Sequence, residues 1–109
     1  MEKNNEQKLF SAVSLCRRAA KLTMGFDAVV ESVYAGKAAL VLLAADVSEG
    51  TAKRIRRSCD DLVPCLQIPL TQEDLRPVTH RKVGVYAVTD DNLAKLCEQY
   101  LEQQKEDNE

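Results

Sequence analysis

The chain of 109 residues is expected to fold as a three-layer α/β/α sandwich, with a small mixed sheet of about four short strands between layers of helices. Two observations favour this α/β class. Amphipathic helical patterns alternate along the chain with short apolar runs, and the longest run, 38–45, is apolar throughout, as in a strand buried on both faces. The length fits one domain over residues 1–109.

The first half of the chain begins with a polar lead, 1–6, which is expected to be frayed. Apolar residues then recur at helical spacing and predict a helix over 7–20. Gly25 interrupts the pattern. A second helix is expected over 27–35, capped by Asp27, because its carboxylate can accept an unpaired backbone N–H.

The buried strand 38–45 is followed by a third helix. Ser48 is its expected N-cap, and Pro64 is expected to end it. The apolar side of this helix includes Leu62, and its other side is strongly basic. A short strand is expected at 65–68.

Three elements are expected in the remainder. Residues 71–74 can cap a short helical turn, which Pro77 should stop. A second buried strand is expected at 83–89, and the last helix should begin at Asp90 or Asp91.

Charge is unevenly distributed. The formal net charge is −2, from 15 Lys and Arg against 17 Asp and Glu. Residues 98–109 carry −4, so residues 1–97 carry +2. The acidic tail 102–109 is expected to fray. A mildly basic body weakens the objection that an acidic chain makes a poor nucleic-acid partner.

The four cysteines have no C-x-x-C spacing, so neither a zinc site nor another metal or cofactor site is expected. Reduced core thiols are the simplest interpretation, and a Cys59–Cys65 disulfide remains open. The single histidine, His80, lies in an expected turn without a recognisable catalytic partner. The start is polar and the longest apolar run is too short to cross a bilayer, so a cytoplasmic protein without membrane contact is expected.

Basic side chains gather in three places. One cluster precedes Gly25, one lines the third helix and one precedes the second buried strand: Arg17, Arg18 and Lys21; Lys53, Arg54, Arg56 and Arg57; and Arg76, His80, Arg81 and Lys82. Each cluster is either a solvated charged face or a binding surface. A glycine turn that leads into a helix N-terminus is more specific, because free N–H groups there attract phosphate oxygens.

The segment 17–51, RRAAKLTMGFDAVVESVYAGKAALVLLAADVSEGT, resembles the L7Ae family of ribosomal proteins, especially its small bacterial members. The shared order is a basic helix end, a glycine, a helix, G-K-A, an apolar strand and A-x-D-x-S before another helix. The segments VGVYAVT and TDDNLAKL extend the resemblance to about residues 7–98.

The resemblance implies a non-enzymatic RNA-binding protein that recognises a kink-turn or internal loop in ribosomal or other structured RNA, in some cases on the ribosome. The family's G-x-N-E-x-T-K element corresponds to Gly25–Glu31, and its L-G-x-A-x-G element corresponds to Leu75–His80. The implied RNA-binding residues are Arg17, Arg18, Lys21, Gly25, Phe26, Asp27, Val30, Glu31, Lys37, Ile68, Pro69, Leu70, Thr71, Arg76, His80, Arg81 and Lys82. Within this set, 68–71 would wedge against an unstacked nucleotide.

Glu31, Glu73 and Asp74 place acid where the family is basic. They motivate a second hypothesis, a protein-interaction module on the same fold with a degenerate RNA surface. A small-molecule enzyme is the third alternative.

Overall fold

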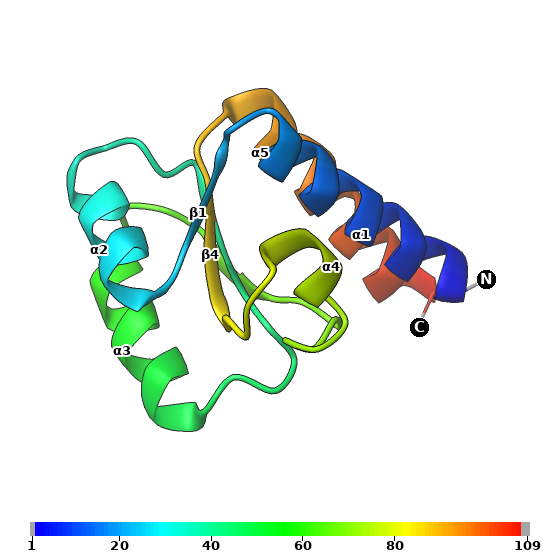
Figure 1. The fold of residues 1–109 in the computed structure, drawn as a ribbon. Helices are drawn as coiled ribbons and strands as arrows, with labels where there is room; N and C mark the ends of the chain where they lie inside the picture. The colour runs from blue at the N-terminus through cyan, green and yellow to red at the C-terminus, as the bar shows by residue number, and fades with distance from the viewer. Residues whose placement is uncertain (1, 108–109) are drawn as a thin grey trace.

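The computed structural model describes the backbone of residues 2–107 and the side chains of residues 6–101. Within this part of the chain, helices and strands alternate after a first long helix (Figure 1). The elements are α1 (Glu2–Arg18), β1 (Leu22–Met24), α2 (Phe26–Tyr34), β2 (Leu40–Leu43), α3 (Glu49–Cys59), β3 (Cys65–Gln67), α4 (Arg76–Thr79), β4 (Val85–Val88) and α5 (Asp91–Asp107).

The strands form one mixed sheet in the order β1-β4-β2-β3. The β4 strand pairs antiparallel with both β1 and β2, and β2 pairs parallel with β3. Val41 lies opposite Ala87 on one side and Cys65 on the other, which fixes the register at the centre of the sheet. The predicted small mixed sheet is confirmed.

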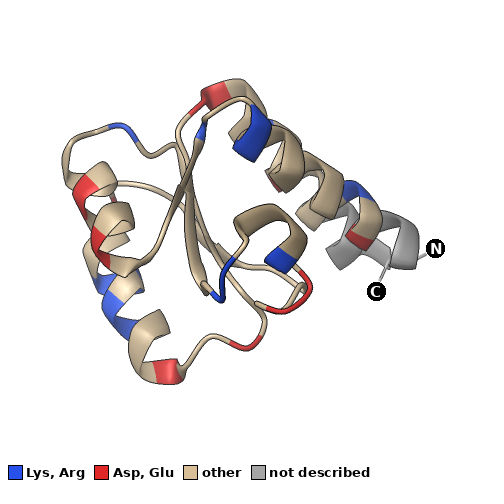
Figure 2. Ribbon diagram, in the orientation of Figure 1, with Lys and Arg blue, Asp and Glu red and all other residues tan. Residues whose placement is uncertain are grey.

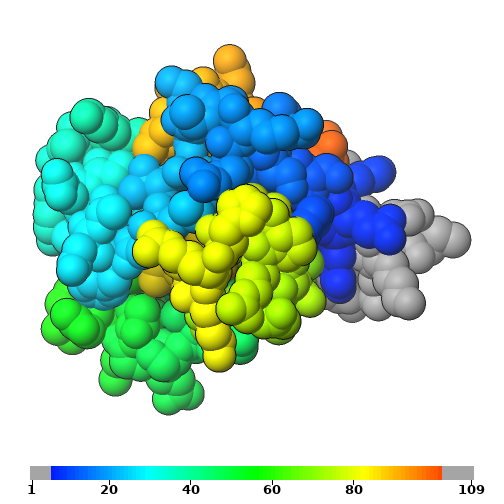
Figure 3. Space-filling model, viewed as in Figure 1, coloured from blue at the N-terminus to red at the C-terminus, as the bar shows by residue number. Residues whose placement is uncertain are grey.

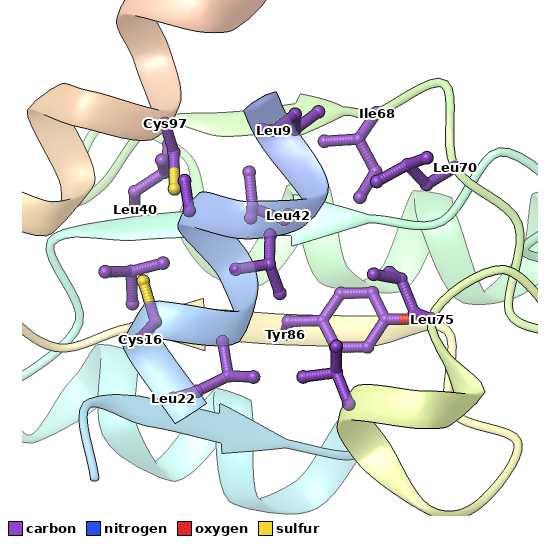
Figure 4. Packing of buried hydrophobic residues seen from close by; sticks show 14 of the residues in the cluster. Leu9, Cys16, Leu22, Leu40, Leu42, Ile68, Leu70, Leu75, Tyr86 and Cys97 are labelled. Carbon is purple, nitrogen blue, oxygen red and sulfur yellow. The ribbon is translucent and has the colours of Figure 1, made fainter. Parts of the chain in front are cut away.

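Each face of the sheet is covered by its own helices, because side chains alternate between the two faces of a strand. Leu40, Leu42 and Tyr86 pack under α1, α4 and α5, as Figure 4 shows for the side nearest α1. Val41 and Leu43 pack against α2 and α3 on the opposite face. The three-layer α/β/α arrangement is therefore confirmed, with a separate hydrophobic core on each side.

The first helix is longer than predicted. It begins at Glu2 instead of Gln7, so the prediction of a frayed lead was wrong for residues 2–6. Apolar periodicity could not reveal these turns because they are polar, although Glu, Lys and Gln favour helices. At the other end, Ala20 adopts a left-handed φ of 60°. The Lys21 N–H donates to the Cys16 carbonyl and the Ala20 N–H to that of Arg17, which forms a Schellman motif.

Strand β1 was not located from the sequence. Its three residues, Leu22–Met24, are too few to show an alternating pattern. They are held at the sheet edge by pairing with β4, a segment more than sixty residues away.

Helix α3 ends earlier than predicted. Ser48 is its N-cap, accepting from the Thr51 N–H at 3.2 Å, but the helix stops at Cys59 and not near Pro64. Asp60 turns the backbone to a φ of 40°. As a result Leu62 is 65% exposed, contrary to its predicted place on the apolar side, and Val63 is buried instead.

Pro77 lies inside a helix instead of stopping one. It lies in the first turn of α4, where a missing N–H costs nothing. The predicted capping at 71–74 is confirmed: the Thr71 N–H donates to Asp74 Oδ2 at 2.9 Å and the Asp74 N–H donates to Thr71 Oγ1 at 3.0 Å.

The last helix, α5, begins at Asp91. Asp90 caps it by accepting from the Leu93 N–H at 2.9 Å. The helix continues to Asp107, so the tail predicted to fray is helical over 102–107, and residues 108–109 lie outside the described part of the chain.

All four cysteines are free thiols, so the Cys59–Cys65 disulfide left open by the sequence is not formed. Burial is the main cause that raises the pKa of both of these thiols, and that of Cys59 reaches about 12. Among the described residues, none of the helices is long and apolar enough to cross a membrane.

Candidate nucleic-acid interface

The turn between β1 and α2 leaves the N-terminus of a helix without a side-chain cap. Gly25 is the N-cap residue, with φ 99° and ψ 150°, a conformation that is nearly exclusive to glycine. Its N–H donates to the Val85 carbonyl at 3.0 Å, which ties the turn to the start of β4. The prediction that Asp27 caps this helix was wrong, because α2 begins at Phe26 and Asp27 lies within its first turn. Its first amide groups therefore remain available to an outside acceptor.

The segment after α4 lies across from this turn. His80 ends α4 in a left-handed conformation, φ 63°, and the exposed Arg81 and Lys82 follow. The Arg81 Nη2 lies 3.5 Å from the Met24 carbonyl oxygen, to which it donates, and 3.7 Å from the position of a Cβ on Gly25. The guanidinium of Arg81 is thus held over the glycine turn.

A hollow of about 460 Å³ lies between the glycine turn and this basic segment. Its lining comes from five places in the chain, namely Gly25 and Phe26, Asp46–Ser48, Thr51, Gln72 and Arg81–Val85. The space-filling view shows the segments near residues 25, 50 and 80 meeting on one face (Figure 3). We call this surface the Gly25–Arg81 hollow.

Two contacts hold the floor of the Gly25–Arg81 hollow together. The Asp46 carboxylate accepts from the Gln72 N–H at 3.0 Å. Gly84 packs so closely that a Cβ there would lie 3.1 Å from Val47 Cγ2 and 3.3 Å from Gln72 Cδ. These lining residues were missed by the sequence analysis because loops far apart in the chain supply them. The A-x-D-x-S element at 44–48 was the one signal that could have indicated Asp46 and Ser48.

The charges around the hollow are mixed in sign (Figure 2). Three of the acidic side chains have structural partners: Asp46 and Asp74 accept backbone N–H groups, and Glu73 pairs with Arg76 at 3.2 Å. Among the described residues, Arg81 and Lys82 form no ion pair. No acidic side chain of the described part of the chain therefore neutralises the cations that line the hollow.

Other predicted site residues lie elsewhere. Lys21 lies beyond the far end of β4 from the Gly25–Arg81 hollow, where its carbonyl accepts from the Thr89 N–H. Lys37 and Glu31 line a different hollow of about 310 Å³ beside Thr89.

Arg17 and Arg18 have positions of their own on α1. The Arg17 Nε donates to the Val78 carbonyl at 3.3 Å, which links α1 to α4. Arg18 lines a groove of about 490 Å³ between α1 and α5. Val30 packs between α2 and α3.

The predicted nucleotide wedge at 68–71 is only partly at the surface. Ile68 and Leu70 are buried in the core beneath α1, so their part of that prediction was wrong. Their side chains point inward because the segment continues the sheet edge after β3. Pro69 and Thr71 are half-buried.

Among the described side chains, no group of three His, Cys, Asp or Glu residues could hold a metal ion. His80 and the cysteines are not among the residues that line the Gly25–Arg81 hollow. Its polar groups are amides, hydroxyls, one carboxylate and two cations, which suit binding of an anionic polar ligand.

Known proteins are similar to this chain in sequence or in structure. RNA-binding protein YlxQ from Enterococcus faecium is 27% identical over 103 residues, covering 94% of this chain and 99% of that protein. RNA-binding protein YlxQ from Bacillus subtilis strain 168 is 33% identical over 90 residues, covering 78% and 86%. A solved structure of a protein of unknown function from Bacillus halodurans C matches with a TM-score of 0.80 at 25% identity, over 87% of this chain and 97% of that one.

The Giardia lamblia 15.5kD RNA binding protein has the same fold, with a TM-score of 0.75 at 20% identity over 94% of this chain and 88% of that one. The family model for the ribosomal protein L7Ae/L30e/S12e/Gadd45 family matches residues 7–100, which include every strand of the sheet and both walls of the Gly25–Arg81 hollow. With most of its length matched, this chain belongs to that family.

Proposed function

We propose that this chain is a cytoplasmic, non-enzymatic RNA-binding protein that recognises a kink-turn or a similar internal loop in ribosomal or other structured RNA. The observation that carries the proposal is the position of the free cations Arg81 and Lys82 across a hollow from the uncapped N-terminus of α2. Amide groups at a helix N-terminus and cationic side chains both bind phosphate oxygens.

An irregular RNA fits this surface better than a regular duplex does. The Gly25–Arg81 hollow is concave, and Asp46, Ser48, Thr51 and Gln72 contribute hydrogen-bonding groups to its lining. A-form RNA hides its base edges in a deep, narrow groove, whereas an internal loop exposes bases that such groups can contact. The names of the YlxQ relatives support RNA as the ligand.

The test is a calorimetric titration of the protein with kink-turn, internal-loop and plain duplex RNAs at two salt concentrations. We expect the irregular RNAs to bind more tightly than the duplex. Arg81→Gln and Lys82→Gln should each weaken that binding by about 1 kcal/mol or more, because each removes a phosphate contact. Lys95→Gln, on the exposed side of α5, makes the same charge change away from the hollow and should have no effect.

Absence of binding to all three RNAs at micromolar protein and low salt would overturn the proposal. A protein-interaction module would instead retain its partners in a pull-down after ribonuclease treatment.

A further inference from the structure

A row of basic side chains on α3 has no acidic partner among the described residues. Lys53, Arg54, Arg56 and Arg57 are all exposed, whereas Ala52, Ile55 and Cys59 form the buried side of the helix. Among the described residues, none of these four cations forms an ion pair, although Asp60 and Asp61 follow in the chain. Figure 2 shows this basic stretch along α3.

Helix stability does not account for this row. Arg56 and Arg57 lie in the last turn, where positive charge favours the helix dipole, but Lys53 and Arg54 lie before it. Lys53 and Arg57 are four residues apart, a spacing at which like charges destabilise an isolated helix. The concentration of positive charge therefore suggests an external anionic ligand.

The basic row is continuous with the Gly25–Arg81 hollow. Thr51 lines the hollow, and Arg54 and Arg57 follow it at intervals of three residues, which places them along one side of α3. The Arg54 guanidinium lies 4.4 Å from the centroid of the Phe26 ring, and Phe26 also lines the hollow. This cation–π contact holds the first arginine of the row at the edge of the hollow.

From Thr51 to Arg57 the helix rises about 9 Å, so long cationic side chains lead directly away from the hollow. No aromatic or amide side chain accompanies Lys53 and Arg57 on this outer side. Such a surface suits phosphates, which are recognised by charge without regard to base sequence.

We propose that Arg54, Arg57 and Lys53 bind the phosphate backbone of the duplex stem that flanks the irregular RNA element. This inference rests on the proposed function, because it supposes that the irregular element occupies the Gly25–Arg81 hollow. The α3 row adds affinity and salt dependence, while the hollow supplies the preference for irregular RNA.

The test starts from the internal-loop RNA that binds most tightly in the titration above, made with minimal stems. This RNA is compared with two longer RNAs, in each of which one of the two stems is extended by ten base pairs. A plain duplex of the same length is the fourth RNA. The double variant Lys53→Gln/Arg57→Gln is measured beside wild type and beside Lys8→Gln/Lys95→Gln, which makes the same charge change on exposed positions of α1 and α5. Thermal melting confirms that each variant is folded.

For wild-type protein, one extended stem should increase affinity roughly tenfold and steepen the dependence of log Kd on log salt by about two. The α3 variant should lose both gains and retain wild-type affinity for the RNA with minimal stems. The Lys8/Lys95 variant should behave as wild type on all four RNAs.

Each other outcome is decisive. Equal gains from an extended stem in wild type and in the α3 variant would overturn the role of α3 while leaving the hollow in place. Wild type could instead bind duplex and loop RNAs equally well, with this binding lost in the α3 variant. That result would support phosphate binding by α3 and overturn the proposed function. Failure of wild type to bind any of the four RNAs would overturn both.

Discussion

Ala20 and His80 hold left-handed backbone conformations that their side chains disfavour, with φ of 60° and 63°. Each follows a helix end, at α1 and at α4, where the chain must turn toward a strand. A Cβ at such a position crowds the following carbonyl and costs about 1–2 kcal/mol. The surrounding fold must impose both conformations, since the sequence carries no glycine at either place.

Replacement of Ala20 by glycine should therefore stabilise the protein. Ala20 is exposed, so the loss of its methyl group sacrifices little packing. We expect Ala20→Gly to raise the free energy of unfolding by about 0.5–1 kcal/mol, after the greater entropy of glycine in the unfolded chain offsets part of the gain. Urea unfolding measures this, with Ala19→Gly as the control that should destabilise. A loss of stability in Ala20→Gly would contradict the Schellman ending of α1.

The buried Cys59 thiol should make stability depend on pH in the alkaline range. Burial, followed by the neighbouring Cys65 thiol, raises the pKa of Cys59 from 9.0 to about 12. The folded state therefore favours the protonated thiol, and this contribution to stability is complete below about pH 9. It is lost as the pH rises toward 12, because the unfolded chain ionises first.

The measurement is the free energy of unfolding in urea at pH 8 and pH 10.5. Between these two values wild type should lose about 1–2 kcal/mol more than Cys59→Ala does, since the variant lacks the thiol. Equal losses in the two proteins would show that Cys59 does not cause the effect.

At the scale of elements, the connection between β3 and α4 is organised by its own polar side chains. Thr71 and Asp74 exchange hydrogen bonds with each other's backbone N–H groups, and Asp46 accepts from Gln72 between them. This rigid segment contributes Gln72 to the Gly25–Arg81 hollow. The acidic Asp74, which the sequence placed on the RNA face as a repulsive charge, thus has a structural partner.

A double-mutant cycle tests this reciprocal cap. Thr71→Val and Asp74→Ala should each cost about 0.5–2 kcal/mol of stability, as the loss of a helix cap does. Because the two side chains act on one turn, the double variant should cost less than the sum of the single variants. Chemical denaturation gives the three values, and strict additivity would argue that the two bonds are independent.

Elements with a local apolar pattern could be predicted from the sequence, and elements without one could not. The apolar run at 38–45 and the amphipathic patterns of α1 and α5 are local signals, so those elements were found, although α1 begins earlier and α5 ends later than predicted. Three residues of β1 carry no such signal, and Pro77 is compatible with the start of a helix as well as its end. Helix α3 ends where Asp60 adopts a positive φ, and the spacing of apolar residues does not predict such a backbone angle.

At the scale of the molecule, the candidate interface is a product of the topology. Gly25 and Arg81 were both identified in the sequence, and the strand order brings them together because β1 and β4 are neighbours. Lys21 and Lys37 were grouped with them as implied phosphate contacts, yet they lie beyond the opposite end of β4. Asp46 and Gln72 were missed because their pairing joins two loops that a linear motif does not connect.

Two adjacent leucines of β2 should report on the two cores separately. Leu42 packs beneath α1 and α5, and Leu43 packs against α2 and α3. Leu42→Ala and Leu43→Ala should each cost about 2–5 kcal/mol, because each leaves a buried cavity. Amide hydrogen exchange should accelerate mainly in α1 and α5 for the first variant and in α2 and α3 for the second. Uniform acceleration in both variants would mean that the layers open together.

The pairing of α1 with α5 has a consequence for biosynthesis. These helices lie side by side across one face of the sheet, although they are the first and last elements of the fold (Figure 1). During translation the α2–α3 side has all its helices as soon as β4 emerges, whereas Leu40, Leu42 and Tyr86 lack the cover of α5 until it has left the ribosome exit tunnel. The apolar face that α1 and α5 share is therefore covered completely only when the last element of the fold has been released.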